Sequence, residues 1–86
     1  MLGSKSDLWL NELGIYTLDD LRKAGAITTY IKLKQRHAKI SLNLLYAMVA
    51  ALEGRDWRDV AANDKGKLLM TLEAHQDFEL LLYEEE

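Results

Sequence analysis

The stretch that decides the fold is Ser41 to Gly54, SLNLLYAMVAALEG. Between Leu42 and Leu52 every residue except Asn43 is apolar, so a helix here cannot keep all its apolar side chains on one face. A helix that is apolar nearly all round belongs inside a bundle. With about 12 residues it is too short to span a bilayer, which needs roughly 20. The stretch therefore predicts the buried central helix of a small helical domain.

Both ends of this central helix, predicted over residues 42–53, carry boundary signals. Ser41 is suited to the N-cap, and Ile40 and Leu45 can pack together as a hydrophobic staple. Gly54 can adopt the left-handed conformation that ends a helix. These signals fix the helix within a residue or two.

Before the central helix, caps and glycines divide the chain into three short helices. Ser6 is suited to cap the first, and Gly14 ends it. Thr17 and Asp20 stand at N-cap and N3 of the second, close to a capping box. The predicted ranges are residues 7–13, 18–24 and 26–36. The side chains expected to face inward are Leu8, Trp9, Leu10 and Leu13 in the first helix, Leu21 with Tyr16 as its staple partner in the second, and Ile27, Tyr30, Ile31 and Leu33 in the third.

After the central helix, Asp56 is suited to cap a single turn that folds Trp57 and Val60 back on the core. A last helix begins at residue 63 or 64, and it either runs to about residue 83 or breaks near residues 75–77. The fold predicted from these elements is all-α, a compact bundle of about five helices around the central helix. We expect residues 84–86 to be frayed, because carboxylates at a helix C-terminus oppose its dipole.

Composition bounds the function of this 86-residue chain. It has no cysteine, so disulfides and thiolate metal sites are excluded. Its first residues do not form a signal peptide, so a cytoplasmic location is expected. The net charge of -3 hides an asymmetry, because residues 1–40 carry seven Lys/Arg against four Asp/Glu and residues 41–86 carry four against ten.

The sequence contains no catalytic motif, and it predicts a non-enzymatic protein without a cofactor or metal. His37 and His75 are interpreted as surface histidines. Asn43 is interpreted as hydrogen-bonding a neighbouring turn, because a buried unpaired amide costs on the order of 1 to 3 kcal/mol; a binding role is the alternative. Trp9, with Trp57 and Tyr46, is interpreted as core or rim.

The candidate nucleic-acid or anion contacts are basic residues at the start of the chain and at the end of the third helix. They are Lys5, Lys32, Lys34, Arg36 and Lys39. Amides at the start of the first helix, near Lys5, are suited to hold a phosphate. Cations near a helix C-terminus also complement its dipole, which gives the cluster from Lys32 to Lys39 a purely structural explanation. The acidic pI of about 5.3 argues against duplex DNA as the main partner.

The chain contains an ordered series of motifs with regular spacings: Leu2-Gly3-Ser4-Lys5-Ser6, Trp9-Leu10, Gly14-Ile15, Thr17-Leu18, Leu21, Gly25-Ala26, Tyr30, Leu33-Lys34, Ser41-Leu42-Asn43-Leu44-Leu45-Tyr46-Ala47, Ala51-Leu52-Glu53-Gly54 and Trp57. This series resembles the C-terminal domain of the TfoX/Sxy competence regulators. The resemblance divides the chain into a family-like helical domain, residues 1–73, and a helical extension with an acidic end, residues 74–86.

This resemblance implies positive regulation of DNA-uptake genes in bacteria and a helix-hairpin-helix or SAM-like arrangement, and it brings no catalytic residues. The Gly-x-Gly turn and preceding helix of a phosphate-binding hairpin are missing around Gly3. The function predicted is therefore that of a regulatory or adaptor module acting through protein contacts. Direct DNA binding by Lys5 and the residues from Lys32 to Lys39 is the alternative.

The extension is too apolar for a solvated tail. Its candidate self-association residues are Phe78, Leu81, Leu82 and Tyr83. Leaving three or four such side chains exposed forgoes roughly 1.5 to 3 kcal/mol each. We expect them to pack either on their own bundle or in a homodimer through the last helix. No membrane contact is expected, and the protein partner is not identified by the sequence.

Overall fold

Six helices make up the part of the chain that the structure describes. The computed structural model describes the backbone of residues 2–84 and the side chains of residues 2–75. The helices are α1 (Ser4–Glu12), α2 (Leu18–Ala24), α3 (Ala26–Arg36), α4 (Leu42–Glu53), α5 (Trp57–Asn63) and α6 (Lys65–Glu84). None of them, over these residues, combines the length and apolarity that crossing a bilayer requires. The all-helical fold is confirmed, with one helix more than predicted.

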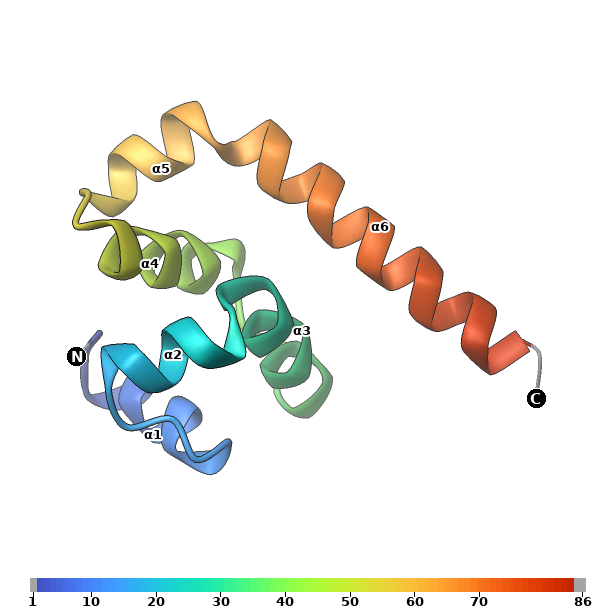
Figure 1. Ribbon diagram of the computed structural model, residues 1–86, viewed down its shortest axis with the longest axis horizontal. Coiled ribbons are helices and arrows are strands. Elements are labelled where there is room, and N and C mark those ends of the chain that lie inside the picture. The colour runs from blue at the N-terminus through green and yellow to red at the C-terminus, as the bar shows by residue number, and fades with distance from the viewer. Residues whose placement is uncertain (1, 85–86) are drawn as a thin grey trace.

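The central helix α4 occupies the predicted range and lies among α2, α3 and α5 (Figure 1). Its buried side chains are Leu44, Leu45, Tyr46, Met48 and Ala50. Gly54 ends it with φ 65°, as predicted, whereas the Ser41 side chain makes no cap hydrogen bond. Asn43 is exposed rather than buried, so water can hydrogen-bond its amide and the prediction of an internal partner is wrong.

The second and third helices match their predicted bounds because local signals fix them. Thr17 and Asp20 form the complete capping box: the Asp20 N–H donates to Thr17 Oγ1 at 3.1 Å and the Thr17 N–H donates to Asp20 Oδ2 at 3.2 Å. Gly25, with φ 86°, separates α2 from α3. Tyr16 is 66% exposed, so the predicted staple with the buried Leu21 is not formed.

The first helix begins three residues earlier than predicted, and Ser6 lies inside it. The Asp7 carboxylate accepts the Leu2 N–H at 3.0 Å, and the Asp7 N–H donates to the Gly3 carbonyl at 2.8 Å. These two bonds close a turn before Ser6 and make Gly3 the N-cap. Leu8, which we expected to face inward, is 66% exposed.

The segment after α4 is a helix of seven residues, where the sequence predicts a single turn. The Asp56 carboxylate caps it as predicted, accepting the Arg58 N–H at 2.8 Å. Val60 is fully buried, but Trp57 is 45% exposed and the prediction that it folds back on the core is wrong. The Arg58 guanidinium instead lies over the Trp57 ring, with its Cζ atom 5.7 Å from the ring centroid.

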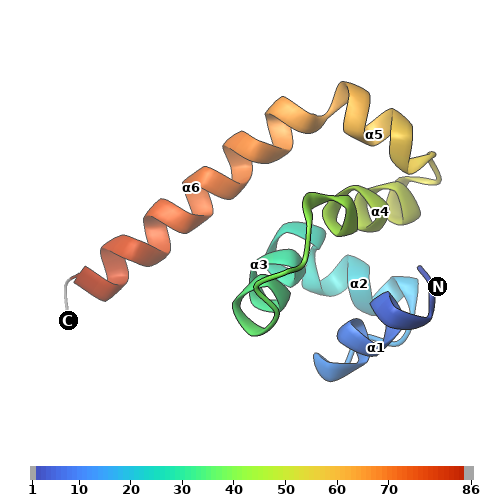
Figure 2. The same cartoon turned by 180° about the vertical axis from the view of Figure 1, so that it is seen from behind.

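The last helix, α6, is continuous, so of the two predicted alternatives the long helix is confirmed and the break near residues 75–77 is absent. Its first part contacts α3 and α5 and buries Leu68 and Leu72, and the helix then projects away from the other five (Figures 1 and 2). The domain division predicted after residue 73 falls inside α6 and stays a prediction. The side chains of Phe78, Leu81, Leu82 and Tyr83 lie outside the described residues. Of residues 84–86, which we expected to be frayed, Glu84 still belongs to α6, and residues 85 and 86 lie outside the described residues.

Candidate functional site

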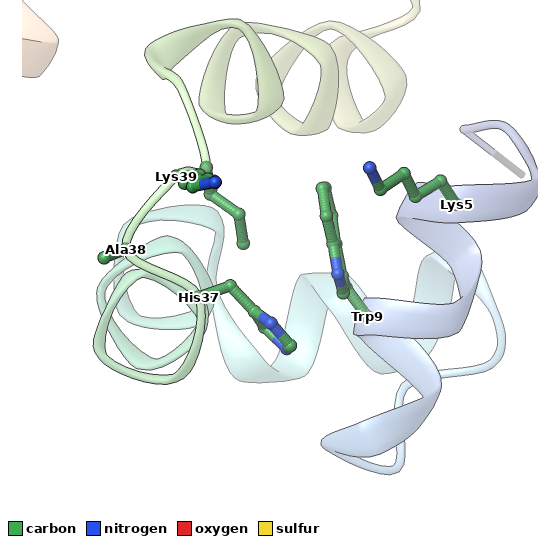
Figure 3. A pocket seen from close by; sticks show the side chains of 6 residues that line it. Lys5, Trp9, His37, Ala38 and Lys39 are labelled. Atoms are coloured by element: carbon green, nitrogen blue, oxygen red, sulfur yellow. The ribbon is translucent and has the colours of Figure 1, made fainter.

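A pocket of about 330 Å³ lies between α1 and the loop that joins α3 to α4 (Figure 3). Its lining residues are Lys5, Trp9, His37, Ala38, Lys39 and Ile40. Lys5 and Trp9 come from α1. They are four positions apart and therefore lie on the same face of the helix. The other four are consecutive loop residues. The pocket therefore joins two parts of the sequence that are about thirty residues apart.

The Trp9 indole is the centre of this pocket. The Lys5 ammonium lies 5.4 Å from the ring centroid, within the range of a cation–π contact. The His37 imidazole lies 5.7 Å from the indole centroid, with the two planes tilted by 35°. Figure 3 shows Lys5 on one side of the Trp9 ring and His37 and Lys39 on the other. Half-buried Trp9 is thus held in one orientation by contacts on both sides.

His37 joins the end of α3 to α1. Its Nε2 atom lies 2.8 Å from Glu12 Oε2, and because a carboxylate only accepts, the imidazole N–H donates. Arg36 places its guanidinium 3.9 Å from the same oxygen. Protonation of His37 turns this hydrogen bond into an ion pair. The contact was not predicted, since the sequence interpretation left His37 on the open surface.

Lys34 fixes the loop that lines the pocket. Its ammonium donates to the carbonyl oxygen of Ala38 at 2.7 Å and to that of Ile40 at 2.6 Å. The His37 N–H donates to the carbonyl of Leu33 at 2.8 Å, which continues the α3 ladder by one residue. Lys34 therefore has the structural role that the helix-end argument allows, and its charge still lies beside the pocket.

The five predicted basic residues do not form one continuous surface. Lys5 and Lys39 line the pocket, while Lys34 lies behind its loop and Arg36 faces Glu12. Lys32 is exposed on α3 and does not line the pocket. The structure thus places Lys5 and Lys39 in the lining of one pocket, together with Trp9 and His37, which sequence reasoning did not assign to a site.

A second polar cluster surrounds Arg55, between α4 and α6. Its guanidinium donates to Glu53 at 2.7 Å, to Asp59 at 2.8 Å, and to both oxygens of Asp64 at 2.8 and 3.3 Å. Hydrogen bonds from Arg55 lower the pKa of Asp64, and Arg55 and then Asn63 lower the pKa of Asp59. The bonds to Asp64, then Asp59 and Glu53, raise the Arg55 pKa.

This Arg55 cluster is interpreted as a structural clamp. The Arg55 guanidinium donates hydrogen bonds to the carboxylates of the cluster. Its two bonds to Asp64 are parallel, which is a strong and well-oriented geometry. Over the residues that the structure describes, no group of three or more His, Asp or Glu side chains is placed to hold a metal ion. The clamp fixes the angle at which α5 and α6 follow α4.

The family model of the TfoX C-terminal domain matches residues 2–72. No curated protein and no solved structure matches the chain. The matched range includes the pocket, the Arg55 cluster and the part of α6 that contacts the bundle. It ends at Leu72, where the buried residues of α6 also end among those described.

Proposed function

Because the chain belongs to the TfoX C-terminal domain family, we propose that it is a non-catalytic regulatory or adaptor module, acting in the control of competence or transcription. We further propose that it works through protein contacts, in the cytoplasm, with the helix-hairpin-helix or SAM-like arrangement that the resemblance implies. The pocket and the Arg55 cluster offer no nucleophile paired with a base, and the groups of the Arg55 cluster are engaged with one another.

The observation that carries this proposal is the projection of α6. The side chains of residues 73–75 are exposed at the point where the helix leaves the bundle, and its backbone continues as a helix to Glu84. A helical segment that projects from its bundle is marginal in water, because most helical stability in proteins comes from packing. The sequence of this segment includes Phe78, Leu81, Leu82 and Tyr83. We propose that a second copy of the chain covers it.

Sedimentation velocity of the full chain, from low to high micromolar concentration, tests this contact. We expect a reversible dimer, and we expect Leu81→Glu to give a monomer with an unchanged melting temperature at low concentration. Glu79→Gln is the matched control and should leave the dimer intact. A parent chain that stays monomeric at high micromolar concentration would exclude pairing through α6.

Direct DNA binding is the second candidate, and the presence of both Lys5 and Lys39 in the lining of one pocket favours it. Against it stand the net charge of -3 and the engagement of Lys34 and Arg36 within the protein. We expect a dissociation constant at or above roughly 10 µM near 0.15 M salt, in the non-specific range, with a steep loss of affinity as salt rises. Fluorescence anisotropy measures this, and a tight, sequence-selective complex would reverse the ranking.

A further inference from the structure

The pocket concentrates positive charge in an otherwise acidic protein. Lys5 and Lys39 line it, and Lys34 donates to the carbonyls of the loop that lines it. Arg36 and His37 both contact the Glu12 carboxylate. The part of the chain with the opposite charge is its last stretch, where three glutamates follow Leu82 and Tyr83. The two halves of the chain are thus electrostatically complementary, which favours and orients their association.

The shape of the pocket selects the chemistry of its ligand. A nucleobase stacked between the Trp9 and His37 rings would need the two rings to be about 7 Å apart, which is twice the contact distance of two carbon atoms. The ring centroids are only 5.7 Å apart, so a nucleobase does not fit between them. A carboxylate can contact the ammonium groups of Lys5 and Lys39 without entering the space between the Trp9 and His37 rings. Lys5 and Lys39 lie on opposite sides of Trp9, so a run of several carboxylates fits them better than a single anion (Figure 3).

The lining is also partly apolar. Trp9 and Ala38 offer apolar surface next to the two lysines, while Ile40, also part of the lining, is only 2% exposed. A ligand that matches both properties carries an aromatic or aliphatic side chain immediately before its carboxylates. Residues 82–86, Leu-Tyr-Glu-Glu-Glu, have this order.

We propose that the pocket is the receptor for the acidic segment 83–86 of a second copy of this chain, with glutamates held by Lys5 and Lys39 and Tyr83 against Trp9. The same chain cannot supply the segment, because α6 is continuous to Glu84 and ends on the side of the molecule opposite α1 (Figures 1 and 2). When the end of each α6 reaches the pocket of the other copy, each copy holds one such contact, while Leu68 and Leu72 stay packed in their own bundle. The inference rests on the proposed self-association and identifies the surface to which the last residues of the projecting helix bind.

The test uses full chains carrying Trp57→Phe, which leaves Trp9 as the sole tryptophan. The pocket variant adds Lys5→Glu and Lys39→Glu. The tail variant adds Glu84→Lys, Glu85→Lys and Glu86→Lys. A control with Lys32→Glu and Lys65→Glu changes the net charge as the pocket variant does, at two exposed residues that do not line the pocket.

Self-association is measured by sedimentation, together with Trp9 fluorescence. We expect each of the pocket and tail variants to self-associate roughly tenfold more weakly than the parent, and the control to match the parent within about twofold. An equimolar mixture of the pocket and tail variants should restore association and the parent's Trp9 emission. In that mixture each reversed pocket meets a reversed tail, and each original pocket meets an original tail.

Two results would overturn the inference in distinguishable ways. In the first result, Leu81→Glu breaks the parent dimer but the pocket variant associates as strongly as the parent. This result would exclude the pocket contact and would still support the contact through α6. A parent without self-association removes both. Trp9 emission that responds to inorganic phosphate or a DNA duplex, and not to the mixture of variants, would assign the pocket to a free anion or nucleic acid instead.

Discussion

The two long helices α4 and α6 are both rich in apolar residues, yet the structure treats them differently. Helix α4 has 12 residues, and none of its side chains from Leu44 to Leu52 is exposed. Helix α6 has 20 residues; of the side chains described in it, Leu68 and Leu72 are buried and Met70 is 73% exposed. The difference lies in neighbours, because α4 packs among α2, α3 and α5, whereas α6 buries Leu68 and Leu72 near its start and its backbone then projects away from the other helices (Figures 1 and 2).

This contrast teaches that apolar content sets how much a helix gains from burial, while its position decides whether the gain is realised within the chain. For α4 the bundle supplies the cover. For α6 beyond Leu72, the cover that its sequence requires is expected from another molecule. Substitutions in the two helices, and at the junction between them, therefore have different expected effects on stability.

Leu45→Ala should have the largest effect. Leu45 is fully buried in α4, and the substitution leaves a cavity, which costs about 2 to 5 kcal/mol in comparable cores. In a domain of this size that unfolds much of the population. Chemical denaturation measures the loss, and a value under about 1 kcal/mol would mean that α4 is not the centre of the core.

Arg55→Met should have the next largest effect, because it breaks the junction that connects α4 to α6. The substitution keeps an unbranched apolar stem but removes the bonds to Glu53, Asp59 and Asp64, and leaves three carboxylates close together. We expect a lower melting temperature, with a decrease smaller than that of Leu45→Ala. A melting temperature equal to the parent's would show that the junction does not depend on the clamp.

The pH dependence of stability gives a separate test of the clamp. The pKa values of Asp59 and Asp64 are lowered in the folded chain from an ordinary 3.8. Their contacts therefore stabilise the protein above that value, and the stabilisation is lost as the pH falls through the lower folded pKa. The parent's melting temperature should fall as the pH drops below about 4, and the curve of Arg55→Met should be flatter there.

Thr17→Ala should cost about 1 kcal/mol, because it removes the hydroxyl that accepts the Asp20 N–H at the start of α2. Ser41→Ala is the matched control at the start of α4. The Ser41 side chain makes no cap hydrogen bond, so its removal should cost less than Thr17→Ala in the same urea titration. Equal losses would indicate that Ser41 caps α4 in solution.

Local signals explain why much of the fold was predictable. The capping box of Thr17 and Asp20 and the positive φ of Gly25 and Gly54 need only neighbouring residues, so α2, α3 and α4 have their predicted bounds. The predictions that failed concern which way a side chain faces. Tyr16 lies just before α2 and Trp57 begins α5, and whether their side chains are exposed depends on where other helices lie.

The candidate site was predictable only in part, for the same reason. Lys5 and Lys39 stood out as charges, but nothing local places Trp9 beside His37, which is distant in sequence. Their contact depends on how the end of α3 meets α1, through the bond from His37 to Glu12. Lys34 could be assigned to the helix end from the dipole argument alone, and its two carbonyl acceptors agree with that explanation.

Met70→Ala should have the smallest effect, and it sharpens the contrast between the helices. Met70 is 73% exposed on α6, so little burial is lost, and alanine is the better helix former. At low micromolar concentration the free energy of unfolding should change by less than about 0.5 kcal/mol. Urea titrations at two protein concentrations measure this.

A loss comparable to that of Leu45→Ala at low concentration would mean that the bundle of one chain covers this face of α6. A loss that appears only as the concentration rises would place Met70 in the contact with a second copy, because association stabilises the folded chain by mass action.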